Sequence, residues 1–519
     1  PACWAGYCRL MAPAADRRTR VVLFGASGTL GFAAFGELWR RREQLDLVVL
    51  LRRPNAKRFA RYVAQGLNVE WGDATSIEDV RRAVRGADVV LNAMAVISPA
   101  ADYHPDQARA VNVDAVSNIV TAISEEQDGL ARIRLVHTST VGLTGDRLPP
   151  LHWGRVGDPL NPSILDTYAL GKMAGERLVL ESGIRHLAVL RMTFIMPTNF
   201  AALLTLRDPI MFHMPLETRM EMISSDDAGL ALANAATIDS DSAFWGRVYN
   251  VGGGPGMRTM AQRYQDVALQ LVGLRGIRHV AERNWFATRN FHLQYFADSA
   301  VADQYLQFQR DDIASYLDKL RASTPRWVTA LRATMRFAPL RWISEQATRA
   351  TLRRMATKHR NGPVYWVDHG VTARLDAFFG GLAEYRQIPD WDDQPADDAD
   401  PPHVQVVHGY DDTKAVWTID DLRAAAEFRG GRCAAAHWDG QRITPVDWEC
   451  ARGHRFHATP NTVLHAGHWC VDCAPAPWRP AEEARINPYF AQVWPYGAQV
   501  GVRQEYNESD AEDIVDADR

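Results

Sequence analysis

Short apolar runs recur at an even interval along the first part of the chain, and stretches with helical periodicity separate them. The first run, RVVLFG, is rich in β-branched residues and stops at a glycine, which is typical of a buried parallel strand. Strand and helix that alternate in this way predict an α/β, doubly wound parallel sheet, whose ligands bind at the carboxyl ends of the strands. The predicted strands cover 20–25, 47–51, 67–71, 88–96 and 133–140.

The alternation stops after the first half of the chain. Residues 256–387 are rich in Arg, Phe, Trp and Leu with helical spacing, so we expect a helical extension or cap packed on the sheet domain. Residues 388–403 are acidic and proline-bearing, which indicates a linker. The acidic tail, 500–519, is expected to be disordered. The leader, 1–19, is expected to be disordered too, because it lacks the basic start and apolar run of a signal peptide.

The composition of the chain indicates which classes of binding partner to expect. A net charge of −4 over 519 residues does not indicate a polyanion-binding surface, so we expect no nucleic-acid partner. No apolar run reaches the roughly 18 residues of a spanning helix, so we expect no membrane partner. Four of the six cysteines fall in one late window, whereas a disulfide-stapled secreted protein would spread them, and this favours a cytoplasmic location. These four are Cys433, Cys450, Cys470 and Cys473.

A glycine-rich turn follows the first predicted strand directly. GASGTLG fits the pattern GxxGxxG between a strand and a helix. Glycines there let the backbone approach a pyrophosphate, and the helix N-terminus offers free N–H groups to it. A glycine turn without a ligand is the alternative, but this setting favours a dinucleotide site. The residues expected to line it are Gly25, Ser27, Gly28, Thr29, Leu30 and Gly31.

The end of the second predicted strand bears on which dinucleotide binds. A carboxylate there would bind the ribose 2′-hydroxyl of NAD. The chain has Arg52 and Arg53 instead, and two guanidiniums suit a 2′-phosphate, so we expect NADP and keep NAD as the alternative. A solvated basic turn would also explain the arginines. The further cofactor contacts expected at strand ends are Asp73, Ala74, Asn92 and Ala93.

Tyr168 and Lys172 form a YxxxK motif downstream of the fifth predicted strand. On a helix the two side chains share one face. A nearby ammonium lowers the tyrosine pKa from its usual value of about 10, so that the tyrosine can exchange a proton while a hydride moves. A surface tyrosine beside a surface lysine is the alternative, but lysines are rare in this chain. They are Lys57, Lys172, Lys319, Lys358 and Lys414.

The fifth predicted strand ends in hydroxyl residues. Ser139 or Thr140 could hydrogen-bond a substrate oxygen and orient it toward Tyr168. Serine and threonine are common at strand ends, so a purely structural role stays open.

Seven motifs occur in the order found in one known family. They are GASGTLG, GDATSIEDV, HTSTVGLTG, YALGKMAGERLV, VLRMTFIMP, MISSDDAGLALANAA and GRVYNVGGG. Over residues 20–255 the chain therefore resembles the extended short-chain dehydrogenase/reductases, the NAD-dependent epimerase/dehydratase group. Residues 256–387 match no family that we can name.

The resemblance implies a Rossmann-type fold for 20–255, including the substrate pocket, and a Ser/Thr–Tyr–Lys triad. Tyr168 would be the acid/base, and Lys172 would lower its pKa and hold the nicotinamide ribose. Thr140 takes the Ser/Thr position, where most members carry serine, and Ser139 is the alternative.

The resemblance also assigns Arg191 and Pro197 to a segment that forms part of the cofactor and substrate wall. After that segment, where family members build their substrate pocket, the chain is apolar and rich in methionine. Its polar points are Arg207, His213 and Arg219. This balance slightly favours an alcohol or ketone on an apolar body over a nucleotide sugar, although plain core packing would give the same composition.

A cysteine and histidine pattern marks residues 404–499 as a zinc-binding module. Cys450, His454, Cys470 and Cys473 give CxxxH, a gap and CxxC, a closed tetrahedral set that suits structural zinc. Reduced cysteines in a small core are the alternative, and Cys433 and His457 are alternate ligands. The segment resembles short zinc-ribbon-like modules, some of which occur in proteins that act on nucleic acid. We expect a folding or oligomerisation role instead.

The leading hypothesis is an NADP-dependent dehydrogenase or reductase that acts on an alcohol or ketone of a largely apolar small molecule, and a homodimer is the assembly that we expect. One alternative is a nucleotide-sugar epimerase or dehydratase that holds NAD tightly. Another is a cofactor-sensing or nucleic-acid-associated regulator, which the intact YxxxK motif disfavours because a sensor needs no proton donor.

Overall fold

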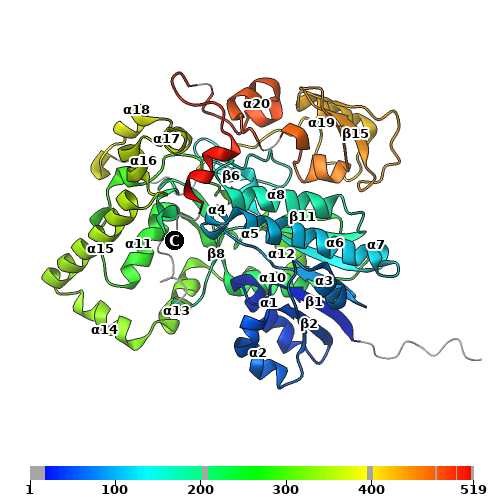
Figure 1. The fold of residues 1–519 in the computed structure, drawn as a ribbon, viewed down its shortest axis with the longest axis horizontal. Helices are drawn as coiled ribbons and strands as arrows, with labels where there is room; N and C mark the ends of the chain where they lie inside the picture. The colour runs from blue at the N-terminus through cyan, green and yellow to red at the C-terminus, as the bar shows by residue number, and fades with distance from the viewer. Residues whose placement is uncertain (1–17, 201–207, 394–400, 474–475, 498, 516–519) are drawn as a thin grey trace, which may run out of the picture.

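The computed structural model describes residues 18–200, 208–393, 401–473, 476–497 and 499–515. Its centre is a seven-stranded parallel sheet in the order β11-β7-β5-β4-β1-β2-β3 (Figure 1). The predicted Rossmann-type α/β fold is therefore confirmed, and β7 and β11 complete the sheet beyond the five predicted strands. The strands are β1 (Thr19–Phe24), β2 (Leu45–Leu51), β3 (Asn68–Trp71), β4 (Val89–Asn92), β5 (Arg134–Thr140), β7 (His186–Met192) and β11 (Arg247–Val251).

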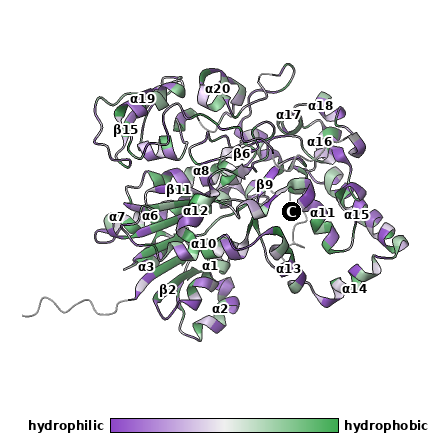
Figure 2. Cartoon of the chain, turned by 180° about the vertical axis from the view of Figure 1, so that it is seen from behind, coloured by the Kyte–Doolittle hydropathy of each residue, from purple (hydrophilic) through white to green (hydrophobic). Residues whose placement is uncertain are grey.

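Helices cover both faces of the sheet because its central strands are apolar on both sides. Val21 and Leu23 of β1 pack into one core cluster with α1 and α10, whereas Val22 and Phe24 pack into a second with α3, α6 and α8. Figure 2 shows these strands as largely hydrophobic. The helices of this domain are α1 (Thr29–Arg40), α2 (Ala56–Val63), α3 (Ile77–Val84), α4 (Ala100–Tyr103), α5 (Pro105–Arg109), α6 (Ala115–Glu125), α7 (Gly129–Arg132), α8 (Thr167–Leu180) and α10 (Ser225–Ala235).

The strand order reverses between β1 and β4, since the chain runs outward from β1 to β3 on one side and from β4 to β11 on the other. Such a switch point leaves a crevice at the carboxyl ends of the two strands, where α/β sheets bind ligands. The glycine turn after β1 and the end of β4 lie at this point.

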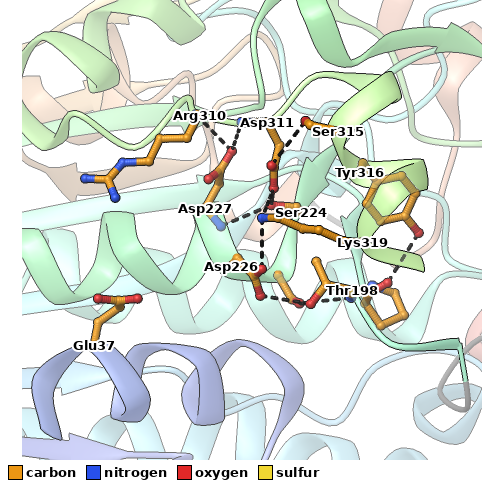
Figure 3. Close-up of polar contacts among 12 residues, drawn as sticks. Glu37, Thr198, Ser224, Asp226, Asp227, Arg310, Asp311, Ser315, Tyr316 and Lys319 are labelled. Atoms are coloured by element: carbon orange, nitrogen blue, oxygen red, sulfur yellow. Dashed lines mark hydrogen bonds and ion pairs between the residues drawn. The ribbon is translucent and has the colours of Figure 1, made fainter. Parts of the chain in front are cut away.

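The extension is mostly helical and packs beside the carboxyl edge of the sheet (Figure 1). Figure 3 shows how α13 docks on α10: the Lys319 ammonium lies 2.7 Å from Asp311 and 3.0 Å from Asp226. Asp227 of α10 accepts hydrogen bonds from the N–H groups of Arg310 and Asp311. The helices are α11 (Ala261–Leu271), α12 (Ser299–Leu306), α13 (Ile313–Ser323), α14 (Arg326–Thr334), α15 (Ala338–Lys358), α16 (Pro363–His369), α17 (Thr372–Phe379) and α18 (Leu382–Arg386).

Three small strand pairs lie outside the main sheet: one joins the loop before α8 to the extension, one joins the two ends of the substrate segment, and one joins that segment to the extension. They are β6 (Trp153–Gly154) with β13 (Tyr295–Phe296), β8 (Ile195–Met196) with β10 (Ile223–Ser224), and β9 (Arg219–Glu221) with β12 (Arg258–Met260).

The C-terminal module has a small core of its own around Trp448, which is completely buried. It does not stand apart: the Arg177 guanidinium of α8 donates to the carbonyl of Trp469 at 2.7 Å. Figure 1 shows the module above α6 and α8. Its elements, with the helices that follow them, are α19 (Ile419–Phe428), β14 (Arg432–Cys433), β15 (Val446–Glu449), β16 (Arg455–Ala458), α20 (Pro480–Ile486) and α21 (Pro488–Ala491).

The expected disorder of the acidic tail is wrong for residues 500–515. Tyr506 and Ile514 are buried, and Asp513 forms a 2.6 Å ion pair with Arg374 of α17. A few apolar side chains and one buried arginine therefore anchor a segment whose composition alone indicated disorder. The leader before residue 18 and linker residues 394–400 lie outside the described residues, and the predicted domain boundaries stay predictions. Among the described helices, none is long and apolar enough to cross a membrane.

Candidate functional site

The glycine turn between β1 and α1 packs directly against the end of β4. Gly25 has a φ of +84°, and a Cβ there would lie 2.7 Å from the carbonyl carbon of Ala93. A Cβ on Gly31 would lie 2.1 Å from the carbonyl oxygen of Gly25. Neither position has room for a side chain, so both glycines are needed to bring β1, α1 and β4 this close.

Gly28 differs from its neighbours because it faces open space. The nearest atom to a Cβ there would be the Gly25 carbonyl oxygen, at an ordinary contact distance of 3.5 Å. Gly28 caps α1 without a side chain, so the N–H groups of Thr29 and Leu30 lack an acceptor within the helix. Exposed backbone without side chains beside free N–H groups fits the pyrophosphate of a dinucleotide.

The two arginines after β2 lie on the surface near the turn after β3. The Arg52 guanidinium is 3.9 Å from the Asp73 carboxylate and remains largely exposed. The Arg53 guanidinium lies 4.9 Å from the centre of the Trp71 ring. Because these contacts are long, both guanidiniums could still bind an anion.

A third arginine, missed in the sequence, approaches the glycine turn itself. The Arg58 guanidinium donates to the carbonyl of Ser27 at 2.6 Å and lies 3.8 Å from the centre of the Phe32 ring. It belongs to α2, whose basic sequence directly after Arg52 and Arg53 was the available signal. Arg58 thus contacts the half-buried Ser27 of the glycine turn, while Arg52 and Arg53 lie at the end of the neighbouring strand.

The remaining predicted cofactor residues lie at strand ends as expected, but they differ in whether their side chains are free to contact a cofactor. The Asp73 carboxylate accepts from the N–H of Thr75 at 3.0 Å, and Ala74 is buried. The Asn92 amide points inward, 3.1 Å from Nδ1 of His137. The backbone of Ala93 is what contacts Gly25, so only its main chain can line the crevice.

Tyr168 and Thr140 come together at the carboxyl end of β5. Tyr168 lies in the first turn of α8, whose N-cap Asp166 accepts from the N–H of Ala169 at 2.9 Å. The Thr140 hydroxyl accepts from the N–H of Gly142 at 3.0 Å and lies near enough to the Tyr168 hydroxyl to lower its pKa in part. The Ser139 hydroxyl is buried and has no hydrogen-bond partner among the described residues, so Thr140 is the hydroxyl that meets the tyrosine.

Lys172 lies one turn further along α8 and is almost completely buried. Its ammonium donates to the carbonyl of Thr138 at 2.5 Å. Burial lowers the pKa of Lys172 to about 8, against the opposing effect of the Glu176 carboxylate.

The expected lowering of the Tyr168 pKa is not found. Burial raises the pKa of Tyr168 to about 12, and the Thr140 hydroxyl opposes that shift only in part. Desolvation of the phenolate dominates and the Asp166 charge adds to it, while the Lys172 ammonium bonds to a β5 carbonyl. The phenol is therefore protonated at neutral pH.

Three acid–base groups beside the triad were missed in the sequence. His292, from the extension, lies 2.6 Å from Asp166, and its ring is 3.2 Å from where a Cβ on Gly142 would lie. Burial alone would lower the pKa of His292, but Asp166 raises it above its usual value. Asp102 accepts from the N–H of Thr167 at 3.1 Å. No local motif marks these residues, because His292 is distant from α8 in the sequence.

Of the two residues assigned to the cofactor and substrate wall, Arg191 lies elsewhere. It is completely buried and pairs with Glu176 of α8 at 2.6 Å, while it also donates to the carbonyl of Ala466 in the C-terminal module. The positive charge of Arg191 is therefore paired with a carboxylate inside the protein. The carbonyl of Pro197 accepts from the hydroxyl of Tyr316, a residue of the extension, at 3.3 Å.

The methionine-rich substrate segment is packed core over much of its described length. Met214, Met220 and Met222 are buried in one cluster with residues of the extension. His213 is buried as well, with Nε2 3.0 Å from the carbonyl oxygen of Asn361. Arg219 is also buried. Arg207 lies outside the described residues.

The four predicted zinc ligands come together, with ligand atoms within 4.8 Å of one another. Sγ of Cys450 lies 3.6 Å from Sγ of Cys473, and Nδ1 of His454 lies 3.2 Å from Cys473 and 3.6 Å from Cys470. A tetrahedral zinc with bonds of about 2.3 Å to sulfur and 2.0 Å to nitrogen needs ligand separations of about 3.5–3.8 Å. The observed distances fit such a site.

The comparisons with known proteins bear on the first part of the chain. Residues 22–193 match the 3-beta hydroxysteroid dehydrogenase/isomerase family. Among curated proteins there is no significant match.

Solved structures with a similar fold include a short-chain dehydrogenase/reductase superfamily protein from Agrobacterium tumefaciens with bound NAD, at 17% identity and a TM-score of 0.44 over 61% of this chain and 99% of that chain. They also include a dTDP-glucose 4,6-dehydratase from Bacillus anthracis in complex with NAD, at 14% identity and a TM-score of 0.46 over 60% of this chain and 99% of that chain. A UDP-glucose 4-epimerase from Thermotoga maritima has 14% identity and a TM-score of 0.45 over 59% of this chain and 98% of that chain.

The family match spans both the glycine turn and the Thr140, Tyr168 and Lys172 group. Residues 22–193 are therefore similar to that family, and the rest of the chain lies outside the matched segment.

Proposed function

We propose that the protein is an NADP-dependent oxidoreductase that interconverts an alcohol and a ketone on a largely apolar small molecule, with Tyr168 as the acid/base. The observation that carries the proposal is the placement of Thr140, at the carboxyl end of β5, beside Tyr168 in the first turn of α8, with Lys172 one turn further along the same helix. This edge of the sheet also holds the glycine turn, so a bound cofactor and the tyrosine would share one crevice.

The chemistry follows from the state of these side chains. When bound, the nicotinamide supplies or accepts the hydride. Tyr168, protonated at neutral pH because its pKa is about 12, donates its proton to the carbonyl oxygen as that oxygen gains negative charge, and Thr140 orients the oxygen. Lys172 anchors the end of β5 through Thr138 and provides positive charge below its pKa of about 8, which stabilises the phenolate that remains. Solvent then returns a proton to Tyr168. A neutral phenol favours the reductive direction.

Three arginines support NADP over NAD. Arg52 and Arg53 follow β2 directly, Arg58 contacts Ser27 of the glycine turn, and each guanidinium could pair with a 2′-phosphate. The turn after β2 offers no carboxylate to bind a ribose 2′-hydroxyl.

The family match supports the apolar substrate. A hydroxysteroid is an alcohol on a large hydrocarbon body, and residues 22–193 match the family described by that substrate. The methionine-rich segment adds no independent support, because much of it is core.

We also propose that Cys450, His454, Cys470 and Cys473 hold a structural zinc ion. The four protein ligands fill a tetrahedral shell and leave no position for a substrate. The small core of the module gives the metal a folding role.

Replacement of Tyr168 by phenylalanine tests the proposed mechanism. We expect Tyr168→Phe to lower kcat with an apolar ketone by about 10²–10⁴-fold, because the proton donor is lost, while the Kd for NADPH changes little. Tyr62→Phe, on α2 and away from the triad, is the matched control and should keep full activity. Wild-type turnover by Tyr168→Phe would rule out the mechanism.

A further inference from the structure

The hairpin of α14 and α15 exposes an unusual number of large apolar side chains. Trp327 is 61% exposed, Phe337 60% and Trp342 59%. Leu331, Leu340 and Ile343 are exposed between them. Figure 1 places α14 at the outer edge of the extension, and Figure 2 shows hydrophobic and hydrophilic positions mixed along both helices. Single exposed apolar residues are normal, but six within seventeen positions are a local concentration of exposed apolar side chains.

The charge of the same hairpin is of one sign. Every charged residue from 326 to 344 is an arginine, and the first carboxylate after them, Glu345, is buried and paired with Arg275. Within the described parts of the chain, no carboxylate forms an ion pair with these arginines. They are Arg326, Arg332, Arg336 and Arg341.

Packing does not explain the patch. In α14 only Val328 is buried, and the connection to α15 adds Met335. Further along α15, Leu352 and Ala356 are buried and attach the hairpin to the extension. The exposed aromatic residues therefore do not hold the fold together, and the face of α14 opposite Val328 is open to a partner.

The combination of exposed aromatic residues and arginines favours one kind of partner over another. Tryptophan and phenylalanine favour the boundary between lipid headgroups and acyl chains, and arginine pairs with lipid phosphates while its stem stays in apolar surroundings. A second copy of this surface in a two-fold dimer would bring the four arginines against the same four arginines, which costs energy. An anionic partner has the complementary charge.

We propose that the α14–α15 hairpin docks the protein onto the surface of an anionic lipid bilayer. Trp327, Phe337 and Trp342 enter the interface, and the four arginines contact the phosphate layer. The expectation of no membrane partner rested on the lack of a spanning segment, which surface docking does not need.

Co-sedimentation with vesicles tests this surface. The full-length protein is mixed with vesicles of phosphatidylcholine alone and of phosphatidylcholine with phosphatidylglycerol. We expect binding only to the second kind, and weaker binding as salt screens the charges. Each arginine removed should lower the partition coefficient about fivefold. Arg332→Ala with Arg336→Ala should therefore lower it about 25-fold, while Arg109→Ala with Arg423→Ala, two exposed arginines elsewhere, should leave it unchanged.

The apolar contribution needs its own variant. Trp327→Ala with Trp342→Ala should lower binding at least tenfold without changing the melting temperature, because both side chains are mostly exposed. Failure of the wild type to bind anionic vesicles would overturn the proposal. So would a wild type that dimerises through this face, becomes monomeric in the tryptophan variant and ignores vesicles.

Discussion

At the scale of single residues, Asp102 is the group whose protonation the fold controls most clearly. Its carboxyl group is buried under the start of α8, where it accepts from the N–H of Thr167. Burial, and then the charge of Asp166, raises the pKa of Asp102 to about 7. The fold thus prefers the neutral form of a side chain that would be charged in the unfolded chain.

This preference makes the stability of the protein depend on pH. Because the folded pKa of Asp102 is raised, its stabilising contribution is complete below about pH 4 and is lost as the pH rises through about 7. Asp102→Asn, a neutral side chain of the same shape, should raise the melting temperature by about 2–4 °C at pH 8 and have little effect at pH 4. Thermal unfolding at both pH values measures this.

The exposed Asp106 of the adjacent helix gives a matched control, and Asp106→Asn should change the melting temperature at neither pH. An equal shift for Asp102→Asn at both pH values would contradict the account, since it would mean that the substitution acts through packing and not through charge.

The sequence predicted the triad residues because spacing on one helix fixes the relation of Tyr168 to Lys172. It did not predict the direction of the Tyr168 pKa, since that depends on how deeply the ring is buried. Nor did it predict His292, which reaches Asp166 only through the tertiary fold. The partners of the Arg191 side chain were unpredictable for the same reason, because Glu176 and the Ala466 carbonyl come from separate parts of the chain.

At the scale of elements, the glycines in the turn between β1 and α1 have two different structural roles. Gly31 and Gly25 allow close packing, while Gly28 leaves space for a ligand. The motif alone shows three equivalent glycines, so the difference between them appears only in the structure.

Alanine substitutions distinguish these uses. Gly31→Ala should destabilise the protein by about 1–3 kcal/mol or more, because its Cβ would lie 2.1 Å from a backbone oxygen. Gly28→Ala should leave the melting temperature unchanged, because its φ of −75° suits any residue, yet it should weaken NADPH binding. Thermal unfolding and cofactor titration of both variants check this. Normal NADPH affinity in a folded Gly28→Ala would contradict the cofactor site.

The strands of the sheet were predictable because each is a short apolar run with a fixed period. The tail was not, since its attachment depends on isolated anchors such as Tyr506 and Asp513 in an otherwise acidic segment. The overall composition of a segment does not reveal a few anchoring residues. For that reason the acidic composition of the tail indicated disorder.

At the scale of the whole molecule, a buried ion network joins the C-terminal module to the catalytic helix. Glu176 of α8 pairs with Arg191, and Nε2 of His468 lies 3.0 Å from the same carboxylate. His468 is two residues before Cys470, and Glu176 is one turn after Lys172. The module is therefore packed onto the element that positions the catalytic lysine.

Loss of zinc should consequently affect more than the module. Cys473→Ser should remove the metal, lower the melting temperature by several degrees and expose the module to proteolysis. His457→Ala, an exposed histidine in the same module, should keep the metal and the stability of the wild type. Metal analysis with thermal unfolding checks both variants, and a stable, zinc-free wild type would contradict the structural role.

The measurement that tests the central claim most directly is the identification of the nicotinamide cofactor. The freshly purified protein is denatured, any released cofactor is identified and quantified, and the affinities for added NADPH and NADH are compared. We predict little bound cofactor and an affinity for NADPH about 10–100-fold higher than for NADH, from charge-assisted bonds to the 2′-phosphate. Near-stoichiometric NAD that does not exchange would contradict this account and indicate an epimerase or dehydratase that recycles its cofactor.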